Sequence, residues 1–366
     1  MEKKIAYVGI DYHLNSLSIA VMVEGEKDFH HSIRLPNEDK VIFKYMKKLS
    51  REFKIKACYE ASGSGYVFQR KMAARGYECD VIAPSLIPRK RGDRRKNDFR
   101  DARNLAQNYA HGMLSVVHPP TEQEESVRCL IRCRLAFKDA EKRVKLQINS
   151  FLLSRGVHWG GNKWTSQHRI WLYRLRLEDP YLQQILNEYL EHMHYLRSRI
   201  MNLDEQIEEI AQSSIYAPAV KKLRAFKGIG TLSAMLLIAE ITDFRRFATP
   251  RALMAFLGLI PSEDSSGDRQ KGGCITKAGN RRCRTQLIES VQHYVRKPCI
   301  GPQMEYDLAQ VDAKSANIAL KCMERLHKRY WALTLKGKVR QVAITAIARE
   351  FVGFIWAMMQ PEAVAG

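Results

Sequence analysis

The sequence predicts an α/β domain followed by a long, mostly helical region, and three observations support this prediction. Short apolar runs alternate with amphipathic patterns through residues 1–118, as in a sheet covered by helices. Glycine is nearly absent from residues 119–218, as expected of long helices. Glycine returns between helical patterns in residues 219–366. We therefore expect three regions with these boundaries: a mixed-sheet domain, a helical middle and a mainly helical C-terminal domain.

The first region predicts a mixed sheet with helices packed on it. Apolar or alternating runs predict strands at residues 5–11, 16–24, 29–35, 54–62 and 77–84. Amphipathic patterns predict helices at residues 37–53, 65–76 and 98–112. The first helix is expected to begin at an Asn37 cap and the second to end at Gly76. Three strands followed by alternating helices and strands are typical of a sheet with parallel and antiparallel neighbours.

Two long helices are predicted in residues 121–215, on either side of the break RGVHWGGNKW. In the second helix, apolar or aromatic residues recur in alternating steps of four and three, which is a heptad seam. Its members are Tyr189, Met193, Leu196, Ile200, Leu203, Ile207 and Ile210. The seam fits an antiparallel hairpin with the helix at 127–152, a coiled coil between subunits, or both. Trp159, Trp164 and Trp171 either form a local core or stack on nucleic-acid bases.

The net charge of +21 and the pI of about 9.7 predict a polyanionic partner, and nucleic acid is the first candidate. No apolar run reaches the roughly 20 residues of a membrane span, and the N-terminus lacks the pattern of a signal peptide. We expect a cytoplasmic protein without a membrane partner. The eight cysteines are expected to be reduced packing groups, with a zinc site at Cys129 and Cys133 as the alternative. His111, His118 and His168 are interpreted as surface or capping residues.

Four carboxylates indicate a metal site at one edge of the sheet. Asp11 ends the first predicted strand and Glu60 ends the fourth, which places both at a sheet edge, where ligands commonly bind. Asp98 and Asp101 share one face of a helix because they are three residues apart. Such oxygen ligands suit Mg²⁺ or Mn²⁺, and two such ions can act on both sides of a phosphodiester. Singly, each carboxylate also fits a turn cap or a salt bridge. Together, in this order on a mixed sheet, they match a ribonuclease-H-like nuclease core.

Two segments carry residues suited to binding a nucleic-acid backbone. Lys227, Gly228 and Gly230 precede an apolar helix. This pattern fits a helix-hairpin-helix element that grips phosphates, or a plain turn between helices. Beside the helix-borne aspartates, Lys96 and Arg100 are further candidates for contact with phosphate.

The polar, glycine-rich segment at residues 260–273 is predicted to be a loop, and it contains three candidate nucleophiles: Ser262, Ser265 and Ser266. A loop serine is usually a turn residue or a cap. It becomes a credible nucleophile only if nearby groups activate it or stabilise the charge it generates. Four cations follow closely and are suited to holding a scissile phosphate: Lys277, Arg281, Arg282 and Arg284.

Six segments occur in an order and spacing that resemble the DEDD transposases of insertion-sequence family 110, a group that includes the Piv-type DNA invertases. The segments are YVGIDYH, CYEASGSGY, KNDFRDARNLA, FKGIGTLSAMLLIAEI, FLGLIPSEDSSG and GGCITKAGNRRCR. The resemblance covers nearly the whole chain, from Ile5 to about Met358.

The resemblance implies a RuvC-like N-terminal domain whose four carboxylates hold the metal, a coiled coil that mediates assembly, and a C-terminal transposase domain. It also implies that Ser266, directly before the glycine, attacks DNA and forms a covalent phosphoserine intermediate, with Ser265 as the weaker candidate. Similar enzymes act as dimers or as tetramers built from two dimers, and the serine of one protomer meets the metal site of another. Their noncoding bridge RNA pairs with donor and target DNA, so that RNA carries the choice of sequence.

Two other functions remain open from the sequence. A nuclease that resolves Holliday junctions, or another hydrolytic nuclease, would use the carboxylates with activated water and would not need the serine. A basic RNA-binding protein with an inactive nuclease core would need neither group, and its binding would depend strongly on salt.

Overall fold

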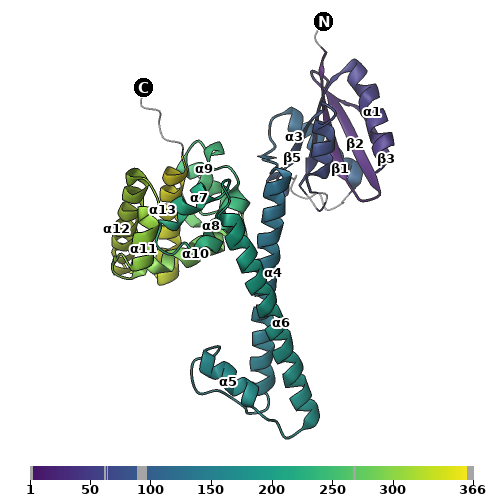
Figure 1. Ribbon diagram of the computed structural model, residues 1–366. Coiled ribbons are helices and arrows are strands. Elements are labelled where there is room, and N and C mark those ends of the chain that lie inside the picture. Colours follow the sequence, from purple (N-terminus) through teal and green to yellow (C-terminus); the bar gives the residue numbers. More distant parts are fainter. Residues whose placement is uncertain (1–2, 62, 64, 89–96, 267–268, 361–366) are drawn as a thin grey trace. The chain divides into compact units, whose positions relative to one another are not determined.

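The computed structural model describes residues 3–61, 63, 65–88, 97–266 and 269–360, and the chain forms two compact units, residues 1–120 and 121–366 (Figure 1). The first unit contains a six-stranded sheet in the order β3-β2-β1-β4-β5-β6. β1, β4 and β5 are parallel, and every other neighbouring pair is antiparallel. The strands are β1 (Ile5–Tyr12), β2 (Ser16–Val23), β3 (Phe29–Pro36), β4 (Lys54–Glu60), β5 (Glu78–Ile82) and β6 (Val116–Val117). The predicted mixed sheet is confirmed, and β6 is an addition.

Helices cover both faces of this sheet. α1 (Asp39–Glu52) and α2 (Val67–Ala73) pack on one face and complete its apolar core. α3 (Asp98–Ala110) lies on the other face, against β1, β2 and β4, and a short 3-10 helix, η1 (Pro84–Leu86), follows β5. The strand order and the helices on both faces agree with the RuvC-like, ribonuclease-H-type fold that the resemblance implies.

α3 can approach β1 closely because the residues between them are small. A Cβ atom on Gly9 would lie 2.2 Å from the carbonyl oxygen of Ala102 and 2.4 Å from the backbone nitrogen of Ala106. Ala20, Ala102 and Ala106 are fully buried at this contact. The backbone of α3 therefore lies directly on β1, the strand that carries Asp11.

The predicted cap of α1 is wrong. The helix begins one residue later, at Asp39, and its N-cap residue, Glu38, makes no side-chain capping hydrogen bond. Asn37 instead donates from Nδ2 to the carbonyl oxygens of His13 and Leu14, at 3.0 and 3.1 Å. Its amide satisfies backbone acceptors in the turn after β1, which is the turn that carries His13.

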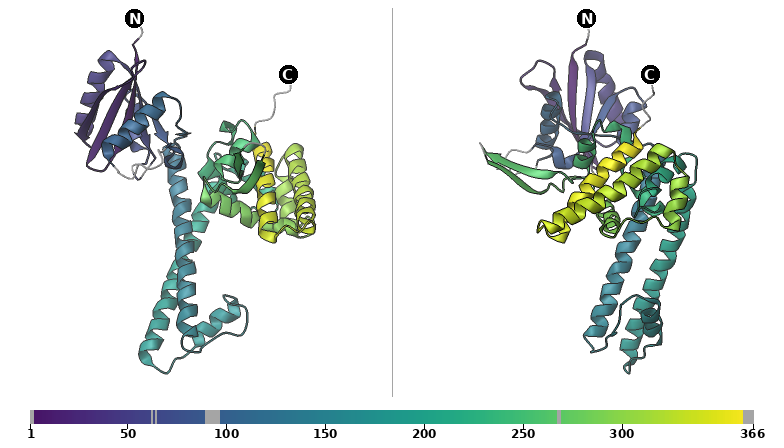
Figure 2. Two further views of the ribbon diagram at one scale, coloured as in Figure 1. Left: turned by 180° about the vertical axis from the view of Figure 1, so that it is seen from behind. Right: turned by 90° about the vertical axis from the view of Figure 1, so that its left-hand side faces the viewer.

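In the second unit, α4 (Glu122–Leu153) and α6 (Pro180–Ala211) pack against each other as an antiparallel helical hairpin (Figures 1 and 2). The buried residues of α6 are Leu186, Leu190, Met193, Leu196, Ile200, Leu203, Ile207 and Ala211. The predicted seam is thus confirmed from Met193 to Ile207. Its end members Tyr189 and Ile210 are only partly buried against the apolar cores, and their neighbours Leu190 and Ala211 are the fully buried residues there. A straight helix has 3.6 residues per turn, so its buried face drifts away from a strict heptad. The intrachain hairpin is confirmed, and a coiled coil between subunits stays a prediction.

A helix of the break, α5 (Ser166–Arg174), carries an aromatic cluster centred on His168. His168 is 2% exposed, so its interpretation as a surface residue is wrong. Its ring lies 5.6 Å from that of Trp171, 5.1 Å from that of Trp164 and 5.7 Å from that of Trp159, centroid to centroid. His168 Nδ1 accepts a hydrogen bond from the backbone nitrogen of Trp164 at 3.0 Å. The tryptophans therefore form a local core, as one of the two interpretations predicted.

The rest of the second unit is mainly helical, as predicted, with a two-stranded hairpin. The helices are α7 (Ala217–Arg224), α8 (Thr231–Ile241), η2 (Phe244–Arg246), α9 (Pro250–Phe256), α10 (Arg281–Ser290), η3 (Val291–Val295), α11 (Pro302–Ala309), α12 (Ala313–Leu335) and α13 (Arg340–Met359). The hairpin pairs β7 (Pro261–Ser266) with β8 (Arg269–Ile275), so the predicted loop at 260–273 is wrong. The segment has no apolar alternation, on which strand prediction depends, and its pairing comes from backbone hydrogen bonds.

Among the described residues, α13 is the one helix whose length and apolar composition would allow it to cross a membrane. Its fully buried side chains, which include Ala343, Ile347 and Phe351, belong to the apolar core of the second unit. α13 packs there against α9, α10 and α12. This packing is typical of a core helix.

Candidate functional site

The first two predicted carboxylates lie on adjacent parallel strands. Asp11 lies near the end of β1, and Glu60 is the last residue of β4. The last paired residues of the two strands are Ile10 and Tyr59, and Asp11 and Glu60 directly follow them. Side chains alternate along a strand, so both carboxylates belong to the face that α3 covers. Adjacent strands are about 4.8 Å apart, and the two carboxylates therefore share one small area of the sheet edge.

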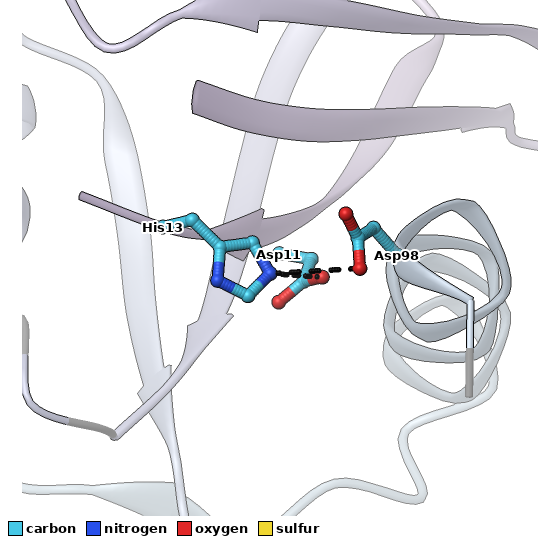
Figure 3. A group of neighbouring side chains, drawn as sticks. All are labelled: Asp11, His13 and Asp98. Carbon is cyan, nitrogen blue, oxygen red and sulfur yellow. Dashed lines mark hydrogen bonds and ion pairs between the residues drawn. The ribbon is translucent and has the colours of Figure 1, made fainter. Parts of the chain in front are cut away.

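A histidine connects Asp11 to Asp98 on α3 (Figure 3). His13 Nε2 lies 3.0 Å from Asp11 Oδ2 and 3.7 Å from Asp98 Oδ1. One possible ligand atom from each of the three residues lies within 4.8 Å of the other two, and no other such group occurs in the described part of the chain. His13 was not predicted from the sequence. Its position two residues after Asp11 was the available indication, because a turn that directly follows a strand stays close to the strand's last residues.

Negative charge accumulates at this edge. Burial raises the pKa of Asp11 above its ordinary value, His13 opposes this shift, and the charges of Asp101 and Asp98 add to it. Glu60 and Asp101 lie outside the three-residue group, although both are half-buried like Asp11. The edge thus contains several carboxylates that disfavour one another's ionisation, an arrangement that a bound cation would stabilise.

The first turn of α3 holds Asp98 in place. The Asn97 side chain accepts a hydrogen bond from a backbone N–H of this turn, which caps the helix. Arg34 Nη2 lies 3.8 Å from Asp98 Oδ2. The N-terminus of α3 also favours a negative charge at Asp98. Of the two cations predicted beside the carboxylates, Arg100 is an exposed residue of α3, and Lys96 lies outside the described residues.

The turn between α7 and α8 contains the predicted phosphate-gripping residues. Lys227 Nζ donates to the carbonyl oxygen of Cys299 at 3.4 Å. Gly228 has a φ of +86°, and a Cβ atom there would lie 2.5 Å from the carbonyl oxygen of Ser290, so packing within the unit already requires this glycine. Gly230 is the N-cap residue of α8, and a Cβ atom there would meet nothing within 4 Å. The accessible part of the turn is therefore Gly230 and the first N–H groups of α8.

The predicted nucleophiles lie on the first strand of the β7–β8 hairpin. Ser262 Oγ donates to the carbonyl oxygen of Cys274 at 3.0 Å and so ties the two strands together near their base. β7 ends at Ser266. The side chains of Ser265 and Ser266 lie outside the described part of the chain.

A buried carboxylate anchors the segment that follows this hairpin. Glu240 on α8 has a side chain that is 1% exposed, and it accepts hydrogen bonds from Arg132 at 2.7 and 2.8 Å and from Asn280 at 2.7 Å. Asn280 in turn caps α10. Burial alone would raise the pKa of Glu240, but the hydrogen bonds and charge of Arg132, with the Asn280 bond, lower it overall. Glu240, a single acid in an otherwise apolar helix, was not predicted from the sequence.

The four predicted cations after β8 fall into two groups. Lys277, Arg281 and Arg282 are exposed, and the two arginines are the first residues of α10. Arg284 is partly buried and donates from Nη1 to the carbonyl oxygen of Leu257 at 2.9 Å. Burial lowers the pKa of Arg284, and Arg281 adds to this shift. The first three are therefore accessible to an anionic ligand, whereas Arg284 bonds within the fold.

Comparison with known proteins assigns the chain to a family. The sequence model for DEDD transposases of the IS110 type matches residues 8–155, and the model described as "Transposase IS116/IS110/IS902 family" matches residues 220–305. A predicted transposase of Sinorhizobium fredii, y4qE, is 36% identical over 356 residues, which are 96% of this chain and 88% of y4qE. The chain belongs to the IS110 family of insertion-sequence transposases. The transposase for insertion sequence element IS1533 of Leptospira borgpetersenii is 32% identical to this transposase over 262 residues, 70% of this chain and 75% of the relative.

The two matched segments of this IS110-family transposase contain the features described above. The DEDD segment spans all four carboxylates and α3, and the second segment spans the α7–α8 turn, the hairpin and α10. Membership of the family implies a DNA-processing enzyme that binds DNA and uses a divalent metal. The described carboxylates at the sheet edge supply oxygen ligands that suit such a metal.

Proposed function

We propose that this transposase is a recombinase guided by a bridge RNA, and that it cuts and exchanges DNA strands through Ser266 with the help of a divalent-metal site. The site would consist of Asp11, Glu60, Asp98 and Asp101. The observation that carries this proposal is the meeting of Asp11 and Asp98 at one sheet edge, beside the end of the neighbouring strand that carries Glu60. As an enzyme that acts on chromosomal DNA in a prokaryote, it would work in the cytoplasm.

The residues at this edge fit a small, hard cation such as Mg²⁺ or Mn²⁺, which prefers carboxylate oxygens. The mutual repulsion of the carboxylates favours a positive charge between them. In addition, Ser18 lies opposite Asp11 in the β1–β2 register, is 1% exposed, and its hydroxyl has no hydrogen-bond partner among the described residues. An unpartnered buried hydroxyl is costly, so Ser18 is available to a ligand of the site. When bound, the cation would supply Lewis-acid stabilisation of charge on a phosphodiester.

The side chains of the protein would hold the cation and position the DNA backbone. Asp11 and Asp98 bind the cation from two elements, one strand and one helix. His13 keeps these two carboxylates at a fixed separation through its contacts of 3.0 and 3.7 Å. The exposed cations Lys277, Arg281 and Arg282 would contact the DNA backbone near the serine hairpin in sequence. Lys96, Arg100 and Gly230 would contact it elsewhere, while Lys227 and Gly228 would hold the turn that presents Gly230. Arg284 supports this surface from within.

The proposed reaction keeps the energy of the cleaved phosphodiester bond in the covalent bond between serine and phosphate. The Ser266 hydroxyl oxygen forms a bond to phosphorus, its proton is released, and a deoxyribose oxygen leaves with the bonding electrons and is protonated. The hydroxyl of another strand then attacks the same phosphorus, and the serine oxygen leaves. Each step breaks one P–O bond and forms one, so strand exchange needs no external energy source.

Two further features support the RNA guide and the oligomer. The net charge of +21 suits a protein that binds both RNA and DNA by their backbones, which leaves sequence choice to base pairing. The carboxylates and the serine belong to different units of the chain, so an active site that contains both must join the units, within one chain or between protomers. We propose a dimer or a pair of dimers that binds donor and target DNA, with the α4–α6 hairpin as the assembly region.

The proposal is tested by adduct formation on DNA that carries the element's junctions, with RNA transcribed from its flanking noncoding segment. We expect Ser266→Ala to abolish SDS-resistant protein–DNA adducts and Asp11→Asn to reduce them strongly. Ser265→Ala is the matched control that is expected to retain them, because it removes the same group one residue away from the proposed nucleophile. Adducts formed by the Ser266→Ala protein would refute the proposed nucleophile.

The same assay separates the alternatives. Nicked DNA with free ends and no adduct would indicate a nuclease of the Holliday-junction-resolving or another hydrolytic type. Unchanged DNA with both the wild type and Asp11→Asn would indicate an inactive core. Recombination of specific sites by protein freed of RNA would exclude the guide.

A further inference from the structure

A basic groove lies at the base of the β7–β8 hairpin. It has a volume of about 810 Å³ and is lined by residues that come from α9, from both ends of the hairpin and from α13. Arg251 and Arg349 stand on opposite elements, α9 and α13, and Ser262 and Thr276 are the hairpin residues that contribute hydroxyl groups. All of these residues belong to the second unit.

Among the side chains that the structure describes, no acidic group compensates the charge of the groove, and those that line it include no carboxylate. Arg251 and Arg349 make no ion pair or side-chain hydrogen bond within the part of the chain that the structure describes. The acid next to Arg349 in sequence, Glu350, is already shared by Arg325 and Arg329 at 3.3 and 3.0 Å. Two guanidinium groups without an acidic partner form a site for an anion.

The lining also limits the kind of anion. Met254 and Ile260 make part of the groove apolar, whereas the arginines and hydroxyls make the rest polar. A nucleic-acid strand has this mixed character, because charged phosphates alternate with apolar sugar faces. A volume of about 810 Å³ exceeds that of a single inorganic anion and suits a segment of strand.

We propose that this groove binds the backbone of the DNA strand that Ser266 attacks. The inference rests on the proposed function and adds to it a binding site for the substrate. Ser262, in the groove, and Ser266 are four residues apart on β7. At about 3.3 Å per residue this is roughly 13 Å along the strand, which corresponds to about four base-pair steps of B-DNA. DNA is favoured over RNA because the groove and the serine share one hairpin.

The test is the salt dependence of binding to a fluorescent 30-base-pair DNA duplex, measured by anisotropy with the full-length protein between 50 and 300 mM NaCl. Each phosphate contact contributes about −0.9 to the slope of log K against log salt concentration. We expect Arg251→Gln and Arg349→Gln each to make this slope shallower by about one. Arg245→Gln removes the same charge from an exposed residue outside the groove and is expected to leave the slope unchanged.

The measured slopes decide whether the groove binds DNA. Slopes of Arg251→Gln and Arg349→Gln equal to that of Arg245→Gln would overturn the proposal, as would a change seen with an RNA duplex and not with DNA. Arg349 is half-buried, so Arg349→Lys keeps the charge and is expected to keep the slope, while the exposed Arg251 provides the test if Arg349→Gln fails to fold. Ser266→Ala is expected to retain the wild-type slope. Removal of the proposed nucleophile would therefore leave DNA binding by the groove unchanged. The proposed nucleophile and the proposed DNA-binding groove can thus be refuted independently.

Discussion

The close contact between α3 and β1 leads to a prediction about Gly9→Ala. The new methyl carbon would lie 2.2 Å from the Ala102 carbonyl oxygen, and real Cβ atoms do not come nearer than 3.0 Å to such an atom. The helix must therefore move by about 0.8 Å or more, because a packed interior cannot absorb the overlap. Both contacting atoms are backbone atoms, so no side-chain rotation relieves the clash. We expect a loss of about 1–3 kcal/mol in the free energy of unfolding.

The same displacement is expected to weaken metal binding. Asp98 moves with α3 while Asp11 stays on β1, so the distance between their carboxylates changes. Changes to groups that hold metal ligands in position typically cost about 10- to 100-fold in metal affinity. We expect Gly9→Ala to weaken Mn²⁺ binding to this extent, as measured by electron paramagnetic resonance of free Mn²⁺, and to lower the melting temperature without metal.

Gly160→Ala is the matched control, because a Cβ atom at Gly160 would meet nothing within 4 Å. It is expected to change stability by only a few tenths of a kcal/mol, through the unfolded chain. A Gly9→Ala protein with the melting temperature and Mn²⁺ affinity of the wild type would refute the reasoning that this glycine sets the position of α3.

The remaining predictions concern two buried polar side chains. Glu240→Gln is expected to cost about 1–3 kcal/mol at neutral pH, because Arg132 loses its charged partner. The folded-state pKa of Glu240 is lowered, so its contribution is present above the ordinary carboxyl pKa and is lost as the pH falls through the folded-state pKa. Thermal melts from neutral pH to below pH 4 should therefore show the difference between wild type and Glu240→Gln shrinking towards acid, and a constant difference would contradict it. Ser18→Ala is expected to stabilise the metal-free protein by up to about 1 kcal/mol, since it removes an unpartnered hydroxyl, yet to weaken Mn²⁺ binding. Calorimetry and Mn²⁺ titration measure the two effects, and equal Mn²⁺ affinity in both proteins would show that Ser18 does not serve the site.

Sequence patterns predicted the sheet because its strands are apolar or alternating and are bounded by turn residues. They also placed Asp11 and Glu60 at strand ends, where the structure has them. They could not reveal that α3 rests on Gly9, because a glycine in a strand has several explanations. Nor could they place His13 against Asp98, since that contact depends on a turn held by Asn37, which follows β3 and is distant in sequence.

Long-range contacts and pairing that depends only on backbone hydrogen bonds were also not predictable from the sequence. The β7–β8 ladder joins polar residues whose side chains carry no strand pattern, so only the backbone pairing identifies it. The Glu240–Arg132 contact spans 108 residues of sequence, and nothing local to either residue specifies the other. Helix length and amphipathic period predicted the α4–α6 hairpin well because each of its helices carries its own apolar stripe.

The Glu240 contacts also bear on how the chain can be divided. Arg132 lies on α4, whereas Glu240 and Asn280 lie more than a hundred residues later. A fragment that starts at residue 219 would retain the buried carboxylate and its Asn280 partner but would lack the arginine that neutralises it. A carboxylate buried without its countercharge is unfavourable by several kcal/mol. During synthesis, α4 with Arg132 emerges before α8 and α10, which carry or follow its partners Glu240 and Asn280. The segment that follows the serine hairpin is therefore anchored only after these distant parts of the chain have come together.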